Sequence, residues 1–201
     1  MSWLLALHSS SEVLGVGLQR CGDPGAARTA AFPLGRTLSN QLLACVEQLL
    51  PASEWPQLDR LVVATGPGGF TGTRLTVVLA RTLAQQLGIP LHGVGSFRLV
   101  AARHRITVPT WVVQPLPRRG VVAGLYGPDA GGLAGVRELE PPRLFASGTT
   151  LRPGPQVAGQ ALLPADVDTL LAIGQEAERL QLAGPWQSVL PVYPTSPVGG
   201  G

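Results

Sequence analysis

The fold of this chain is decided by residues 61–97, which read LVVATGPGGFTGTRLTVVLARTLAQQLGIPLHGVGSF. The pattern predicts an apolar strand over residues 61–65, a helix over 71–87 and a second apolar strand over 91–94. The loop between the first strand and the helix is rich in glycine and proline. Such a loop can turn its backbone N–H groups toward an anion at the start of the helix. It can equally be a tight turn in which glycine supplies a positive φ angle, so its composition leaves both interpretations open.

The residues before this segment predict the rest of one sheet. Residues 3–7 and 13–18 are expected to form two apolar strands joined by a short polar turn, and residues 28–34 a third strand. Residues 36–50 are predicted as a helix, because apolar side chains recur there at helical spacing before Pro51. Three sequential strands followed by alternating helices and strands are typical of an α/β fold with a mixed, ribonuclease-H-like sheet. The same unit is half of an actin-like ATPase (ASKHA) fold.

Beyond residue 107 the pattern weakens. Residues 111–114 and 121–126 are expected to pair across a turn, and residues 166–182 to form a closing helix. The prediction is therefore two lobes with mixed sheets and flanking helices. The first lobe covers residues 1–105, and a smaller, diverged second lobe covers 106–201 and ends in a disordered tail over 194–201.

Composition limits the chemistry. All 15 basic residues are arginine, which excludes a Schiff-base lysine and the lysine of a Walker A loop. The two cysteines form no CxxC pair and the three histidines are scattered, so neither a metal site nor a cofactor is expected. The net charge of +3 is too small to indicate nucleic-acid binding by itself.

Targeting signals are not evident in the chain. No apolar run approaches the roughly 18 residues that cross a bilayer. The first residues lack the basic region and the long apolar stretch of a signal peptide. We therefore expect a cytoplasmic protein without a membrane partner.

The glycine loop and its helix carry a family resemblance. Residues 66–74 read GPGGFTGTR, which resembles the Gly-Pro-Gly-Ser-Phe-Thr-Gly-x-Arg-x-Gly signature of the TsaB (YeaZ-like) family. The segments LGIPL at 87–91 and GV at 93–94 also match, and the resemblance is dense over residues 3–97 and thin after 107. The predicted signature positions are Gly66, Pro67, Gly68, Gly69, Phe70, Thr71, Gly72 and Arg74.

The chain departs from that family at polar positions. The first strand of the family ends in Asp-Thr, whereas this one ends in His8-Ser9. Gly69 replaces the serine of the signature, and Thr76 replaces its last glycine. In ATPases of this superfamily the strand-end aspartate lies beside the phosphates and the metal, so its loss argues against nucleotide hydrolysis. A second-lobe Asp-Ala-Arg-x-x-Glu-Val-Tyr element is reduced to Leu116-Pro117-Arg118 with Val121 and Ala123.

The two predicted helices of the first lobe carry more apolar surface than one contact requires. On residues 71–87, Leu75, Val78, Leu79, Leu83 and Leu87 form the stripe that we expect to face the core, beside a second stripe of small side chains. We predict that this second stripe and its neighbours bind a partner, although the second lobe could cover them instead. The predicted interface residues are Leu42, Leu43, Val46, Leu50, Thr73, Val77, Ala80, Arg81 and Ala84.

The resemblance implies a function. It implies a catalytically inert paralogue of TsaD that serves as scaffold in the tRNA threonylcarbamoyladenosine modification of the adenosine 3′ of the anticodon. Its partners would be a TsaD-like protein and a TsaE-like ATPase, with tRNA contacted indirectly and a homodimer possible for the isolated chain.

Two alternatives stay open at this stage. One is an enzyme of the same fold, either a nucleotide-binding ATPase or a glycoprotease-like enzyme. The other is a module that binds tRNA directly, which would use Arg98, Arg103, Arg105, Arg118 and Arg119.

Overall fold

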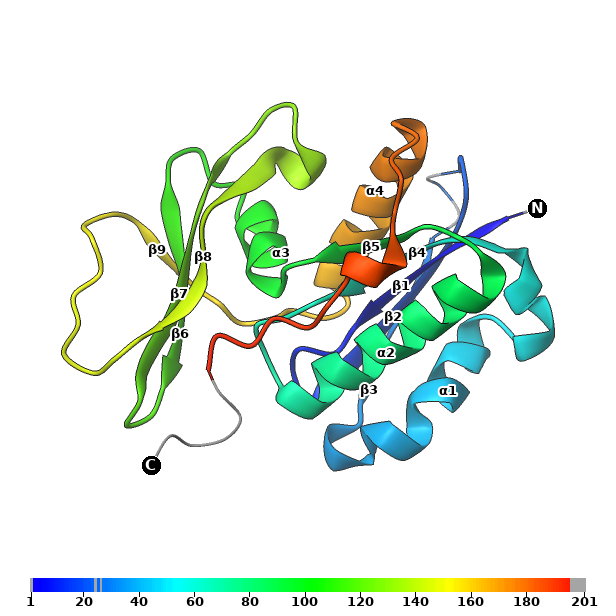
Figure 1. Cartoon of the computed structure of the whole chain (residues 1–201), viewed down its shortest axis with the longest axis horizontal. Coiled ribbons are helices and arrows are strands. Elements are labelled where there is room, and N and C mark those ends of the chain that lie inside the picture. Colours follow the sequence, from blue (N-terminus) through cyan, green and yellow to red (C-terminus); the bar gives the residue numbers. More distant parts are fainter. Residues whose placement is uncertain (1, 24, 26, 196–201) are drawn as a thin grey trace.

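The first lobe is built on a five-stranded sheet in the order β3-β2-β1-β4-β5 (Figure 1). In the computed structural model, which describes residues 2–23, 25 and 27–195, β1 pairs antiparallel with β2 and parallel with β4. β3 is antiparallel to β2, and β5 is parallel to β4. The predicted mixed sheet is therefore confirmed. The strands are β1 (Trp3–His8), β2 (Val13–Arg20), β3 (Arg28–Pro33), β4 (Leu58–Ala64) and β5 (Leu91–Val94).

Helices cover both faces of this sheet (Figure 1). On one face lie α1 (Leu38–Leu49), preceded by the 3-10 turns of η2 (Gly35–Thr37), and α2 (Phe70–Leu87). On the other face lies α4 (Ala165–Arg179), which packs against β1, β4 and β2. The approach of α4 is close, since a Cβ on its Gly174 would lie only 2.7 Å from side-chain atoms of Leu4 and Val62.

The second lobe is a four-stranded sheet in the order β8-β7-β6-β9. The expected hairpin is confirmed, because Trp111 pairs with Leu125 and Gln114 with Val122 across the turn. α3 (Ser96–Arg103) joins the lobes by packing its Phe97 and Val100 onto this sheet. The strands are β6 (Thr110–Leu116), β7 (Gly120–Pro128), β8 (Val136–Phe145) and β9 (Gln156–Ala158).

β8 was not predicted as a strand, for a physical reason. Its sequence VRELEPPRLF contains two prolines and four charged residues. Proline cannot donate to a ladder, and charges discourage pairing with another chain, so both are tolerated on an edge strand. β8 is indeed an edge strand, paired only with β7.

The predicted division at residue 105 is wrong for the C-terminal part of the chain. α4 packs on the first sheet, and the segment that follows returns along β5, the edge strand of the same sheet. Two backbone bonds hold this segment, from Leu91 N–H to Gly184 O at 2.9 Å and from Val192 N–H to Thr65 O at 2.7 Å. We call residues 182–193, which include η5 (Trp186–Ser188), the C-terminal strap.

Two further predictions concern the C-terminal tail and membrane-spanning helices. The tail predicted over 194–201 lies, from residue 196 onward, outside the described residues. Among the helices of the described residues, none combines the length and the apolar character that a bilayer crossing requires.

Candidate partner-binding face and glycine loop

The glycine loop lies at the carboxyl ends of the parallel strands β1 and β4, directly before α2. Its backbone is engaged within the protein: Gly69 N–H donates to Ser10 O at 2.7 Å, and Gly66 O accepts from Ser96 N–H at 2.7 Å. At Gly68 a Cβ would overlap the carbonyl oxygen of Ser10. Glycine is therefore required at this position by a close backbone approach, and the loop is pinned against the turn after β1.

Two of the departures from the family signature meet in the structure. Ser9, at the end of β1, shares a hydrogen bond of 3.0 Å with Thr76 on α2, hydroxyl to hydroxyl. Both residues are buried, and a buried hydroxyl without a partner is costly. A second hydroxyl pair, Ser10 with Ser96 at 2.5 Å, ties the same turn to the start of α3.

His8 occupies the strand-end position at which the family carries aspartate. Its side chain is fully buried, and Nδ1 accepts a long hydrogen bond of 3.4 Å from Ser10 N–H. Burial, followed by the positive charge of Arg103, lowers the pKa of His8 from 6.5 to about 4. The imidazole is therefore neutral at physiological pH, and this position supplies no negative charge for a metal.

A cleft of about 420 Å³ separates the lobes next to the loop. From the first lobe it is lined by Ser10, Glu12 and Gly68, and from the second lobe by Gln114 and Gln160 among others. Among its lining residues within the described chain, Glu12 is the only ionisable one. A phosphate here would meet a carboxylate and no cation, which is unfavourable for an anion.

The predicted orientation of α2 is wrong in part. Leu83 is buried as expected, and Leu75, Leu79 and Leu87 are partly buried against the core. The small stripe Thr73, Val77, Ala80 and Ala84 is buried against the sheet, while Val78, expected in the core, is 52% exposed. Small side chains let the helix lie close to the sheet, which explains why this stripe faces inward. Leu42, Val46 and Leu50 are also buried in the same core, so in the monomer they offer no surface to a partner.

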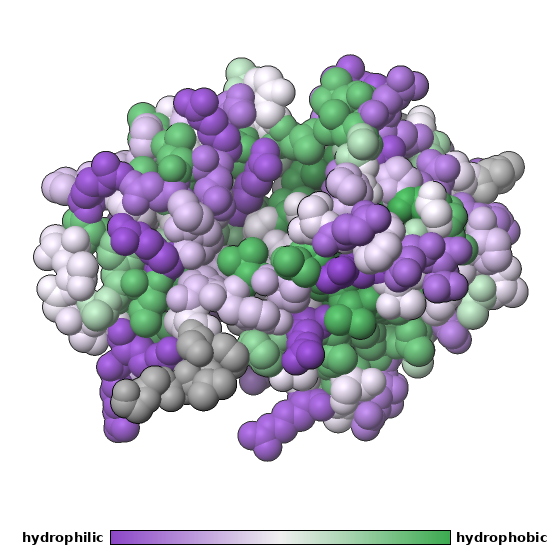
Figure 2. Space-filling view, in the orientation of Figure 1, coloured by the Kyte–Doolittle hydropathy of each residue, from purple (hydrophilic) through white to green (hydrophobic). Residues whose placement is uncertain are grey.

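Two of the predicted interface residues remain accessible. Leu43 on α1 is 52% exposed, and Arg81 on α2 is half-buried with its guanidinium 5.6 Å from the ring centre of Trp186 in the C-terminal strap. Figure 2 shows apolar side chains gathered over α2 and toward α1. We call this surface the α1–α2 face, and its apolar residues are Leu43, Phe70, Leu75, Val78 and Leu79.

The strap borders this face and was not anticipated. The ring of Tyr193 packs on that of Phe70, the first residue of α2, with 4.5 Å between ring centres. Val189 is buried in the core under α2. In the sequence, Pro191-Val192-Tyr193 resembles part of the Pro-x-Tyr-Leu-Arg ending of the family, but this resemblance gives no position in space.

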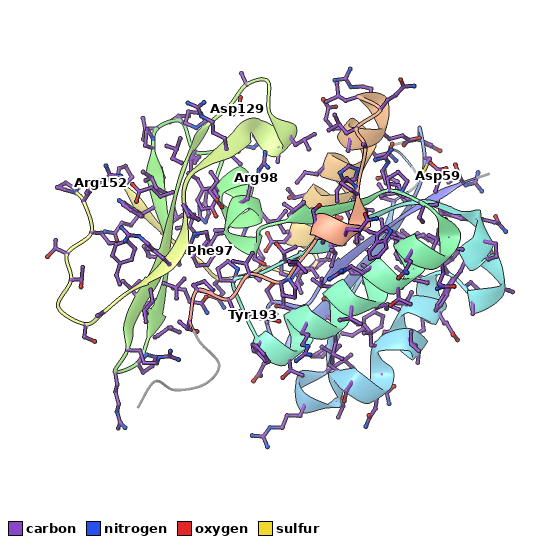
Figure 3. All side chains as sticks on the ribbon, viewed as in Figure 1. Asp59, Phe97, Arg98, Asp129, Arg152 and Tyr193 are labelled. Atoms are coloured by element: carbon purple, nitrogen blue, oxygen red, sulfur yellow. The ribbon has the colours of Figure 1, made fainter. Side chains whose placement is uncertain are left out.

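The arginines considered for direct tRNA binding do not all reach the surface. Arg98 donates to the carbonyl oxygens of Leu133 at 2.7 Å and Val136 at 3.0 Å, and Figure 3 shows it between α3 and the loop that carries Asp129. Arg103 pairs with the buried Asp166 at 3.3 Å. Both arginines therefore hold the fold together. The remaining three, Arg105, Arg118 and Arg119, are exposed at the end of α3 and in the β6–β7 turn.

Two lobes with mixed sheets, a glycine loop at the carboxyl edge of the first sheet and a cleft between the lobes define an actin-like, ribonuclease-H-like protein. Residues 34–116 match the family model of TsaD, described as tRNA N6-adenosine threonylcarbamoyltransferase. The chain is 38% identical over 128 residues to the tRNA threonylcarbamoyladenosine biosynthesis protein TsaB of Bacillus subtilis. The matched region covers 61% of this chain and 54% of that protein. The chain is thus a TsaB/YeaZ-like protein.

Further proteins are similar to the chain in sequence or in fold. An uncharacterized protein of Mycobacterium leprae is 32% identical over 163 residues, 80% of this chain and 37% of that protein. The chain thus spans about half, or less, of the length of these two relatives. The crystal structure of a Pseudomonas aeruginosa protein described as similar to peptidase YEAZ superposes with a TM-score of 0.73 at 22% identity, covering 97% of this chain and all of that one. YeaZ of the same organism gives 0.70 at 23% identity, covering 96% of this chain and all of that one, and both structures show the shared fold.

Proposed function

We propose that this chain is a non-catalytic scaffold subunit in the biosynthesis of tRNA threonylcarbamoyladenosine. In this proposal it binds a TsaD-like paralogue, which carries the chemistry, and shifts that partner toward its active state. A TsaE-like ATPase completes the assembly, and tRNA is contacted only through the partners. The observation that carries the proposal is the α1–α2 face, on which Leu43 and Val78 are each 52% exposed in the monomer. The similarity to TsaB of Bacillus subtilis and to the TsaD family model supports the pathway.

The residues around the glycine loop support a non-catalytic role. The Gly69 N–H of the loop donates to the turn after β1, and the strand-end position holds a neutral, buried His8. An ATPase of this fold would use a carboxylate there. Steady-state turnover of ATP or a peptide by the isolated chain above about 1 s⁻¹, a low rate for an enzyme, would contradict this part of the proposal.

The α1–α2 face has the features of a protein interface. Its centre is apolar, and its edge carries Arg81, whose guanidinium is held in place over Trp186. Interfaces commonly place an apolar centre inside a rim of polar groups, and arginine is enriched there. We propose that two copies use this face in the absence of TsaD and that TsaD replaces the second copy.

The test is a pair of matched substitutions. Val78→Asp places a charge at the centre of the proposed interface, and Val108→Asp places the same charge at a position that is 49% exposed, outside the α1–α2 face. Burying an unpaired carboxylate in an interface costs several kcal/mol, and each 1.4 kcal/mol weakens binding about tenfold. We expect Val78→Asp to weaken binding of the TsaD-like protein of the same cell at least tenfold, measured by calorimetry, and Val108→Asp to leave it unchanged.

Folding must be checked in parallel, by the melting temperature of each variant. Val78 is exposed, and valine and aspartate have similar helix propensities, so the monomer should keep its stability. If Val78→Asp is folded and still binds with the affinity of the wild type, the interface lies elsewhere on the molecule.

A further inference from the structure

The exposed ridge of α2 carries two positive charges around an apolar centre. Arg74 and Arg81 are seven residues apart, which corresponds to two helical turns or about 10 Å along the axis, so they lie on one side of the helix. Val78, which is 52% exposed, lies between them. Neither α2 nor the C-terminal strap contains an aspartate or a glutamate. This part of the α1–α2 face is therefore purely cationic.

Aromatic side chains of the strap lie beside both arginines. The guanidinium of Arg81 lies 5.6 Å from the ring centre of Trp186. Burial raises the pKa of Tyr193, and the positive charge of nearby Arg74 opposes this rise. Tyr193 in turn packs on Phe70, and Figure 3 labels it on the strap beside the first turn of α2. Within the residues that the structure describes, neither arginine forms an ion pair, so both are available to a partner.

The neighbouring helix α1 compensates only part of this charge. Its one ionisable side chain is the exposed Glu47. Arg36 before α1 and Glu54 after it lie beyond the two ends of the helix and offset each other. The exposed ridges of α1 and α2 thus present two cations for one anion.

This imbalance acts against a dimer of two identical copies. In a two-fold dimer both copies contribute the same surface. Two arginines and one glutamate from each copy give four cations and two anions, so at least two arginines lack a partner whichever way the helices cross. Like charges brought together in an interface oppose association. A dimer of this chain is therefore stabilised by the apolar centre and weakened by its own charges.

We infer that the α1–α2 face selects an acidic partner over a second copy of this chain. The partner carries carboxylates about 10 Å apart on either side of an apolar patch, one for Arg74 and one for Arg81. The inference rests on the function proposed above, in which a TsaD-like protein replaces the second copy. Specificity then comes from repulsion in the wrong complex as well as attraction in the right one. An RNA strand is disfavoured, because its charged backbone would cover the apolar side chains around Val78.

The first test compares the salt dependence of the two associations of the full chain. Binding of the TsaD-like protein of the same cell is measured by calorimetry, and self-association by sedimentation equilibrium. We expect the Kd of the heterodimer to rise with salt, because salt screens an attraction between opposite charges. The Kd of the homodimer should fall, because salt there screens a repulsion. A homodimer Kd that rises as steeply as the heterodimer Kd would overturn the inference.

The second test removes the two cations together. The double variant Arg74→Gln, Arg81→Gln should raise the Kd for the TsaD-like protein about tenfold, since an exposed ion pair contributes a factor of up to about five. It should also flatten the salt dependence of that Kd, which a mere loss of packing on Trp186 would not do. The homodimer of the double variant should be tighter than that of the wild type.

A matched control removes a cation elsewhere. Arg119→Gln neutralises an exposed arginine in the β6–β7 turn of the second lobe and should leave both Kd values unchanged. The inference fails if Arg119→Gln weakens heterodimer binding as much as the double variant, or if the double variant binds the TsaD-like protein like the wild type. It also fails if the double variant weakens the homodimer. Binding of tRNA to the isolated chain that the double variant loses would identify a nucleic-acid surface instead.

Val78→Asp separates failure of this inference from failure of the proposed function. If Val78→Asp weakens binding of the TsaD-like protein and the double variant does not, the face is the interface but its charges do not select the partner. If Val78→Asp is folded and binds like the wild type, the proposed interface itself is wrong.

Discussion

At the scale of single residues, neutral polar contacts lie beside the glycine loop, where the family carries a charged aspartate. His8 is buried and neutral, and Ser9 and Thr76 satisfy each other. A second histidine, the half-buried His92, accepts a hydrogen bond at Nε2 from Arg60, and burial followed by the charge of Arg60 lowers its pKa to about 4. Both imidazoles must stay unprotonated in the folded state.

The lowered pKa values of His8 and His92 predict that the stability of the fold depends on pH. The unfolded chain binds their protons near pH 6.5 and the folded chain only near pH 4, so stability is full above pH 6.5 and is lost as the pH falls toward 4. For the fully buried His8 the loss reaches about 3 kcal/mol. His8→Asn keeps an acceptor for Ser10 N–H without a titrating group. Urea unfolding between pH 7.5 and 4.5 should show a weaker decline for this variant than for the wild type. Parallel curves would show that His8 contributes nothing to the decline.

At the scale of elements, the decisive feature is the rotation of α2 about its axis. The stripe of small residues faces the sheet, Leu75 and Leu79 are partly buried at the edge of the same core, and Val78 is exposed. This orientation places the proposed interface one stripe away from the positions that the sequence indicated. It also decides whether a charge introduced at a given position of α2 would be buried or exposed.

Ala80→Asp should therefore unfold the protein and not merely block association. Ala80 is fully buried on the side of α2 that faces the core, so an aspartate would place an unpaired charge there, at a cost on the order of several kcal/mol. Since domains of this size are stable by about 5–15 kcal/mol, we expect a large fall in the melting temperature. Val78→Asp, two residues earlier and exposed, is the matched control. Equal melting temperatures for the two variants would contradict the orientation described here.

At the scale of the whole molecule, the chain crosses from the first lobe to the second and back. α4 buries Leu4, Ala6, Val62 and Ala64 of the first sheet, and the C-terminal strap closes the edge of β5. The first lobe is thus completed by residues far along the chain. A boundary placed where the β-α pattern ends does not separate two folding units.

A fragment of residues 1–105 tests this point. It contains the whole first sheet but lacks α4, so the apolar face beneath that helix would be open to water. We expect the fragment to bind a hydrophobic dye and to unfold without a cooperative transition, whereas a chain of residues 1–195 unfolds cooperatively. A cooperative transition in the fragment would show that the first lobe folds without α4.

The sequence by itself determined the order of the elements up to residue 94, the mixed sheet and the family resemblance. These features depend on local signals: apolar periods of two and 3.6 residues, turns rich in glycine, and the stretch GPGGFTGTR at 66–74. Strand β5 was predicted at its observed bounds, and α2 within one residue. Each of these elements is specified by residues that are close together in the chain.

Only the tertiary structure decided which stripe of α2 is buried, where α4 packs and that β8 is a strand. Helical periodicity marks two apolar stripes on α2, but it cannot say which of them faces the sheet. That choice depends on how closely the helix can approach β4 and on what else covers its other side. Contacts between residues distant in sequence settle both, because burial belongs to the packed molecule and not to any segment of it.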